Sequence, residues 1–228
     1  MPANLRLFGL VHLLILCAVP SLAALLAVAH RRLLIHPLVL RSTVACLLLL
    51  CSSSYYASFA LHGDRMFPNH VPLELCDASL WLVILSLVTL RPAFFDLAYY
   101  FALAGASMSL LTPNMVAPSL FLSVQFFADH GLLVISILYL LWSGQARPRP
   151  WSVFRAMVGL NVFAVIAGAF DAIFKTDYMF LRSKPPTVSA LDLLGPWPWY
   201  ILSCEGVAMG LFLLLYLPFR TSESPATA

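Results

Sequence analysis

The stretch LFGLVHLLILCAVPSLAALLAVA, Leu7–Ala29, contains no charged side chain. A helix needs about 20 apolar residues to cross the hydrocarbon core of a bilayer, so this stretch is long enough. It is too long for the apolar part of a signal peptide, and Arg31 and Arg32 follow it directly. We therefore interpret it as an uncleaved first membrane span.

Similar apolar stretches recur along the whole chain. The predicted further spans are Leu38–Leu61, Leu73–Leu90, Ala93–Leu111, Phe126–Trp142, Val153–Phe174 and Trp199–Leu217. Hydrophobic residues make up 61% of the chain and charged residues only 10%, whereas a soluble domain carries about 25% charged residues. The sequence predicts an all-α, multi-pass bundle of about seven transmembrane helices in the cell membrane. One domain is expected over residues 1–219, followed by a disordered cytoplasmic tail over residues 220–228.

The distribution of basic residues predicts the orientation of this bundle. The first, third and fifth connections and the tail contain eight of them, namely Arg31, Arg32, Arg41, Arg91, Arg147, Arg149, Arg155 and Arg220. The other side contains five, namely Arg6, Arg65, Lys175, Arg182 and Lys184. Because basic residues are enriched on the cytoplasmic side, we expect the N-terminus outside and the C-terminus in the cytoplasm.

Several spans place an ionisable group near their outer end. These groups are Glu74, Cys76 and Asp77 at the start of the third span, His130 near the start of the fifth, Asp171 in the last turn of the sixth and Glu205 in the first turns of the seventh. An acid or an imidazole in hydrocarbon costs a few kcal/mol and is a functional-site candidate by default. We expect these groups to line one polar cavity that opens toward the outer leaflet, with His12 as a weaker member.

Cys76 and His130 are the candidate reacting pair. The partial positive charge at a helix N-terminus favours a thiolate at Cys76, although the carboxylates of Glu74 and Asp77 oppose it. A cysteine with a neighbouring imidazole is the minimum for nucleophilic acyl transfer. A carboxylate such as Asp77 or Glu205 would then orient the imidazole.

Each of these residues also has a purely structural interpretation. Cys76 is explained equally as an inert, packed thiol. His130 is explained as an interface histidine bonded to a backbone carbonyl, and Asp129 beside it is expected to be solvated. Asp171 and Glu205 are explained as partners of basic residues in the following loop, with a role in assembly alone.

Four motifs resemble those of the YwaF-like integral membrane proteins. They are LELCDASLW (Leu73–Trp81), QFFADHG (Gln125–Gly131), TDYMFLRSKP (Thr176–Pro185) and DLLGPWPWY (Asp192–Tyr200). That family is similar to a transmembrane phospholipid-to-lysolipid acyltransferase and, more distantly, to the androgen-induced lipid-ester hydrolases. The resemblance implies Cys76 and His130 as the active pair. Asp177, beside Tyr178, stands where the family more often has asparagine.

Two functions follow as expectations. The first is a lipid acyltransferase or lipid-ester hydrolase that acts on phospholipid or lysophospholipid through a thioester. Cys76 is its nucleophile and His130 its base, and the supporting residues are Glu74, Asp77, Asp171, Asp177, Tyr178 and Glu205. No metal, organic cofactor or nucleic acid is expected. The alternative is a transporter or a lipid- or ion-binding protein, in which Asp171 and Glu205 matter more than Cys76.

Overall fold

The computed structural model describes residues 6–113, 119–185 and 189–220, and in these ranges the chain forms helices and no strands. The α-helices are α1 (Leu10–Arg31), α2 (Pro37–Leu61), α3 (Leu75–Thr89), α4 (Pro92–Tyr100), α5 (Ser107–Leu111), α6 (Leu120–Trp142), α7 (Ser152–Phe174) and α8 (Trp199–Arg220). A π-helical segment, Phe101–Ala106, joins α4 to α5. Two 3-10 turns, Tyr178–Phe180 and Ala190–Leu194, lie between α7 and α8.

The predicted membrane bundle is confirmed. Six helices of the described chain are long and apolar enough to cross a bilayer, with Pro92–Leu111 counted as one rod. The seventh apolar helix, α3, has 15 residues, and at 1.5 Å per residue it spans only about 22 Å of a hydrocarbon core about 30 Å thick. The orientation of the bundle stays a prediction, and most of the predicted tail lies outside the described residues.

Local sequence signals explain where the helices begin. Proline occupies the first position of α2 and of α4, where its missing N–H costs nothing. The Ser119 hydroxyl caps α6 by accepting a hydrogen bond from the N–H of Leu122 at 3.2 Å. Helix α6 therefore begins at Leu120 and not at Phe126. The expectation that His130 lies near the start of its helix is wrong, since it is the eleventh of 23 residues.

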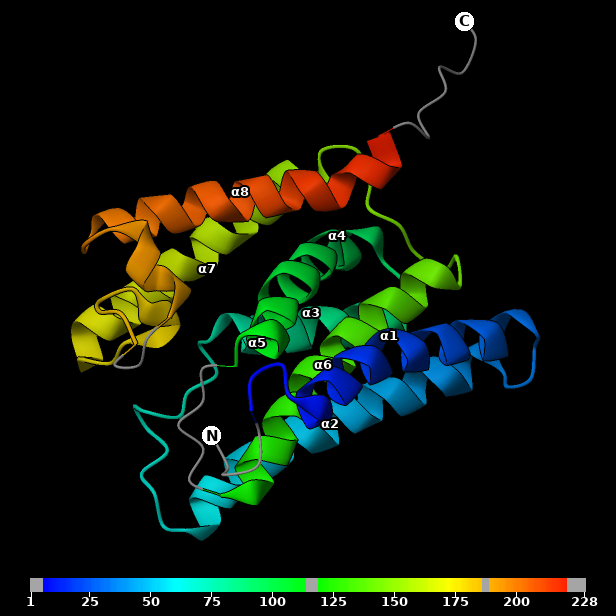
Figure 1. Ribbon diagram of the computed structural model, residues 1–228, viewed down its shortest axis with the longest axis horizontal. Helices are drawn as coiled ribbons and strands as arrows, with labels where there is room; N and C mark the ends of the chain where they lie inside the picture. Colours follow the sequence, from blue (N-terminus) through cyan, green and yellow to red (C-terminus); the bar gives the residue numbers. More distant parts are fainter. Residues whose placement is uncertain (1–5, 114–118, 186–188, 221–228) are drawn as a thin grey trace, which may run out of the picture.

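The helices form two groups around a shared core. Helices α1, α2 and α6 lie side by side, α7 and α8 pair on the other side of the molecule, and α3 and the α4–α5 rod lie between them (Figure 1). The core contains fully buried side chains from the middle elements and α6, among them Leu87, Phe95, Leu133 and Ile137. The central helices are therefore covered by protein, whereas the outer helices present apolar side chains to the surroundings.

One ion-pair cluster fastens the end of the bundle where α3 finishes. The carboxylate of Asp96, on α4, is fully buried. Its Oδ2 accepts from Arg149 at 2.8 Å and from Arg155 at 3.0 Å, and its Oδ1 accepts from the backbone N–H of Arg149 at 3.1 Å. A buried carboxylate needs such partners to offset its desolvation. This cluster ties α4 to the start of α7, at the end opposite Cys76.

Candidate active site

Cys76 occupies the second position of α3. The backbone N–H groups of Leu75 and Cys76 are among the first of the helix and have no acceptor within the described residues. The Asp77 backbone N–H donates to the carbonyl of Glu74 at 3.0 Å. The N–H of Glu74 donates to Asp77 Oδ2 at 3.0 Å, which closes the helix start. The thiol therefore lies beside two free donors in the positive end of a helix dipole.

This helix start lies below the end of its neighbour α2. The Tyr56 hydroxyl donates to Asp77 Oδ1 at 2.8 Å, and Tyr56 precedes the last residue of α2, Leu61, by five positions, or about 7 Å of helix. The π-helical segment packs against the same place, since a Cβ on Gly105 would lie 3.5 Å from Leu75 Cδ2. Irregular turns of this kind are frequent at functional sites. The start of the short α3 thus lies level with the last turns of α2.

His130 is held in the tautomer of a general base. Its side chain is buried, and Nδ1 lies 2.8 Å from the carbonyl oxygen of Phe126. A carbonyl only accepts, so Nδ1 carries the proton and Nε2 keeps a lone pair. Nε2 has no hydrogen-bond partner in the described part of the chain. The Phe126 ring packs on the imidazole with centroids 4.2 Å apart and fixes its orientation.

Asp129 connects the histidine to the cysteine. Its carboxylate is close enough to Cys76, Asp77 and Cys51 for their charges to interact. Its Oδ1 is buried and has no hydrogen-bond partner among the described residues. The expectation that Asp129 is solvated is therefore wrong. With α6 starting at Leu120, Asp129 is an acid within a membrane span, and that signal would have identified it as a site candidate.

Helix α6 thus brings Asp129 close to Cys76 at the start of α3, and His130 is the next residue of the helix. In the described structure no hydrogen bond joins Cys76 directly to His130. Catalytic hydrogen bonds are often long in a protein without substrate and tighten when it binds. The arrangement supplies a thiol, an unprotonated imidazole nitrogen and two free backbone donors in one region of the bundle.

The segment after α7 docks beside this region through Glu74 and Tyr178. Glu74 Oε2 accepts from the backbone N–H of Met179 at 3.0 Å. The Tyr178 hydroxyl donates to the carbonyl of Pro68 at 2.7 Å and accepts from the N–H of Val71 at 2.9 Å. Burial raises the pKa of Glu74 to about 7; the Met179 N–H opposes this rise, and neighbouring carboxylates add to it. Two distant segments therefore meet next to Cys76.

Asp171 and Asp177 shape that segment and are engaged locally. Asp171 is fully buried, and its Oδ1 accepts from the Thr176 hydroxyl at 2.7 Å and from the Tyr178 N–H at 3.0 Å. Asp177 Oδ1 accepts from the Arg182 N–H at 2.8 Å, and its Oδ2 accepts from the Ser183 hydroxyl. These contacts hold both acids in the loop, but Asp171 Oδ2 is buried and has no hydrogen-bond partner among the described residues.

Two further candidates have partners elsewhere. Glu205 Oε2 accepts from the Asn161 side-chain amide at 2.9 Å, between α7 and α8, and no described contact joins it to Cys76. His12 uses both ring nitrogens, since Nδ1 accepts from the Phe8 N–H at 2.9 Å and Nε2 donates to the Leu110 carbonyl at 2.7 Å. A histidine that is satisfied on both sides packs the helix ends together.

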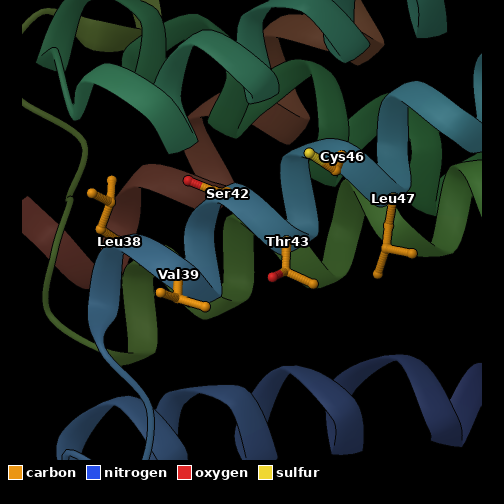
Figure 2. A pocket seen from close by; sticks show the side chains of 6 residues that line it. All are labelled: Leu38, Val39, Ser42, Thr43, Cys46 and Leu47. Atoms are coloured by element: carbon orange, nitrogen blue, oxygen red, sulfur yellow. The ribbon is translucent and has the colours of Figure 1, made fainter.

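A shallow groove of about 450 Å³ lies on α2, away from these residues. Figure 2 shows its lining side chains, which all come from the first half of α2: Leu38, Val39, Ser42, Thr43, Cys46 and Leu47. Tyr56, which marks the level of Cys76, follows Leu47 by nine residues, or about 14 Å of helix. The described residues contain no group of three or more side chains that could hold a metal ion.

Comparisons with known proteins found one matching family and one related protein. The model of the TMEM164 family matches residues 7–216. An uncharacterized protein of Treponema pallidum (strain Nichols) is 29% identical over 225 residues, which cover 95% of this chain and 90% of that protein. No solved structure matches. The expected YwaF-like membership is wrong, because the family that matches is a distinct one. The roles of Cys76 and His130 therefore stay predictions.

Proposed function

The chain belongs to the TMEM164 family, and we propose that it is a membrane-embedded acyltransferase that takes an acyl group from a membrane lipid ester. Cys76 is the nucleophile and His130 is the general base. The observation that carries the proposal is the tautomer of His130, whose Nδ1–H is held by the Phe126 carbonyl. The nitrogen left unprotonated is the one that accepts a proton from a thiol.

The first half of the reaction forms a thioester. Sulfur of Cys76 attacks the ester carbonyl carbon, and its proton passes to His130 Nε2. As the tetrahedral intermediate collapses, the C–O bond breaks and His130 returns the proton to the departing lysolipid oxygen. The negative oxygen of the intermediate would be bound by the backbone N–H groups of Leu75 and Cys76, which have no acceptor within the described chain.

The second half returns the enzyme to its starting state. The hydroxyl of a lysolipid attacks the thioester carbonyl while His130 Nε2 takes its proton. The C–S bond then breaks, and the proton returns to the Cys76 sulfur. Water in place of the lysolipid would give hydrolysis. Glu74, Asp77 and Asp129 surround the thiol with negative charge, which disfavours a free thiolate and makes proton removal by His130 necessary during the attack.

The depth of the site supports a lipid substrate. The start of α3 lies about 7 Å below the end of α2, and the surfaces of the outer helices are rich in exposed leucine, valine and isoleucine. A diacyl lipid entering sideways brings its ester groups near the interface and its chains into the hydrocarbon. A soluble acyl donor would need to reach the same depth from water.

A trapping experiment tests the proposal. Purified protein is incubated with phosphatidylcholine that carries an alkyne-tagged acyl chain, with and without lysolipid, and the protein-bound tag and the tagged product are measured. The wild type is expected to carry a hydroxylamine-sensitive tag that lysolipid removes. Cys76→Ala abolishes the tag, and His130→Ala lowers its rate of formation about a hundredfold or more. Cys204→Ala, which removes a thiol that also lies beside a carboxylate, is the matched control and keeps full labelling.

A second function has its own supporting observation. Asp129 Oδ1 is buried without a partner, and three carboxylates lie near one another, as in proton- or cation-binding sites of transporters. Equal tagging in the wild type, Cys76→Ala and His130→Ala would contradict the acyltransferase. Loss of proton or cation flux across the membrane in Asp129→Asn, with normal flux in Cys76→Ala, would favour transport.

A further inference from the structure

Arg41 lacks a partner at the end of the bundle opposite Cys76. It is the fifth residue of α2, so it lies about 6 Å inside the helix start. Its Nε is buried and unpaired, and neither a hydrogen bond nor an ion pair of its guanidinium is found within the described ranges. A buried guanidinium nitrogen without an acceptor is costly. An acceptor for this nitrogen must therefore come from outside the described residues.

The groups around Arg41 come from three helices. Tyr139 on α6 is fully buried, and its hydroxyl is close enough to Arg41 for electrostatic interaction. The same hydroxyl lies 3.5 Å from Nδ1 of His30, at the end of α1. The next residue, Arg31, donates to the carbonyl of Trp142. Helices α1, α2 and α6 thus converge on Arg41 with hydrogen-bond donors.

Among the described residues no carboxylate forms an ion pair with Arg41. The first acidic residue of the chain is Asp64, so α1, α2 and the turn between them contain none. Asp96, the buried acid at this end of the bundle, is engaged by Arg149 and Arg155. The positive charges of Arg31, Arg32 and Arg41 therefore have no acidic partner within the described chain.

We propose that Arg41, on α2 beside Tyr139 of α6, binds the phosphate of an anionic membrane phospholipid. A guanidinium presents paired donors that match two phosphate oxygens. The site lies near the depth at which headgroups meet hydrocarbon, and basic pockets between transmembrane helices bind headgroups of this kind. The site is separate from Cys76, and the inference does not depend on the proposed reaction.

Native mass spectrometry of the purified full-length protein tests the site. The protein is titrated in parallel with phosphatidylglycerol, with phosphatidylcholine and with inorganic phosphate. The wild type is expected to bind phosphatidylglycerol more tightly than phosphatidylcholine. Arg41→Ala should weaken phosphatidylglycerol binding about tenfold, the loss expected for a charge-assisted hydrogen bond. Arg41→Lys keeps the charge without the paired donors. Its affinity for phosphatidylglycerol should therefore lie between those of the wild type and Arg41→Ala.

A matched control variant and three contradicting outcomes complete the test of the phosphate site at Arg41. Arg65→Ala, which removes an exposed arginine from the loop at the other end of the bundle, should bind phosphatidylglycerol like the wild type. If Arg41→Ala does not fold, Arg41→Lys carries the test, because it preserves the charge. Equal phosphatidylglycerol binding by the wild type and the folded Arg41 variants would overturn the site. Tighter binding of inorganic phosphate than of phosphatidylglycerol would also overturn it, because the ligand would then be a soluble anion. An equal loss of phosphatidylglycerol affinity in Arg65→Ala and Arg41→Ala would overturn it as well.

Discussion

At the scale of single residues, the site is defined by protons and charges. The Phe126 carbonyl fixes the proton of His130 on Nδ1, which leaves Nε2 as a base. Asp129, the preceding residue, acts on Cys76 with a negative charge and has one oxygen unpaired. A carboxylate in this position opposes formation of a thiolate, because like charges placed close together repel. Asp129 is therefore one of three carboxylates, after Asp77 and Glu74, whose charge acts on Cys76.

Asp129→Asn should make Cys76 more reactive. The change removes one negative charge and keeps nearly the same shape, so the thiolate forms more easily and alkylation by N-ethylmaleimide should speed up about threefold or more. The rate is measured on a protein in which the other four cysteines are replaced by serine. Asp64→Asn, in an exposed loop, is the control and should leave the rate unchanged. An unchanged rate in Asp129→Asn would show that its charge does not act on the thiol.

At the scale of elements, a short helix and a docked loop work together. Helix α3 has 15 residues, and its start lies level with the last turns of α2. The segment after α7 docks beside this start, by hydrogen bonds from the Met179 N–H to Glu74 and from the Tyr178 hydroxyl to Pro68. The Glu74 contact carries a titratable group, so attachment of the loop depends on pH.

Stability should fall as pH rises through the pKa of Glu74. Its folded pKa is raised from 4.5 to about 7, so protonation favours the folded state. That stabilisation is complete below about pH 4.5 and is lost as pH rises through about 7. The groups facing Glu74 are Asp77, Asp171 and Asp177, whose negative charges add to the effect, and the Met179 N–H, which opposes it.

Glu74→Gln tests this dependence, because glutamine keeps an oxygen that accepts from Met179 but does not titrate. Thermal unfolding in detergent is measured between pH 5 and pH 8. The wild type should lose more stability than Glu74→Gln over this range. Asp192→Asn, which changes an acid in the same loop farther along the chain, should follow the wild type. If the unfolding temperatures of the wild type and Glu74→Gln change in parallel with pH, Glu74 is not the group that causes the pH dependence.

At the scale of the whole molecule, the sequence was sufficient for the helices and insufficient for their contacts. Uncharged stretches of about 20 residues have one stable form in a membrane, so the bundle was predictable. The start of α6 was missed because the cap at Ser119 precedes an apolar stretch that already looked long enough. Asp129 already lay inside the expected span Phe126–Trp142, but it was set aside because its side chain was expected to be solvated. The pairing of Asp96 with Arg149 and Arg155 was not predictable, because it joins residues more than 50 positions apart.

The orientation of the bundle is the remaining prediction at this scale. With α3 counted as a crossing beside the six longer helices, the two ends of the chain lie on opposite sides, and the excess of basic residues puts the C-terminus in the cytoplasm. In bacterial cells, green fluorescent protein fused to the C-terminus should therefore fluoresce, and alkaline phosphatase fused there should be inactive. Replacing Arg31, Arg32 and Arg147 together with asparagine leaves five basic residues on each side, so the variant should insert in both orientations and show partial phosphatase activity. Replacing Arg6, Arg65 and Lys175 with asparagine instead increases the bias and should leave the phosphatase inactive. Full phosphatase activity in the wild-type fusion would reverse the orientation and place Cys76 near the inner leaflet.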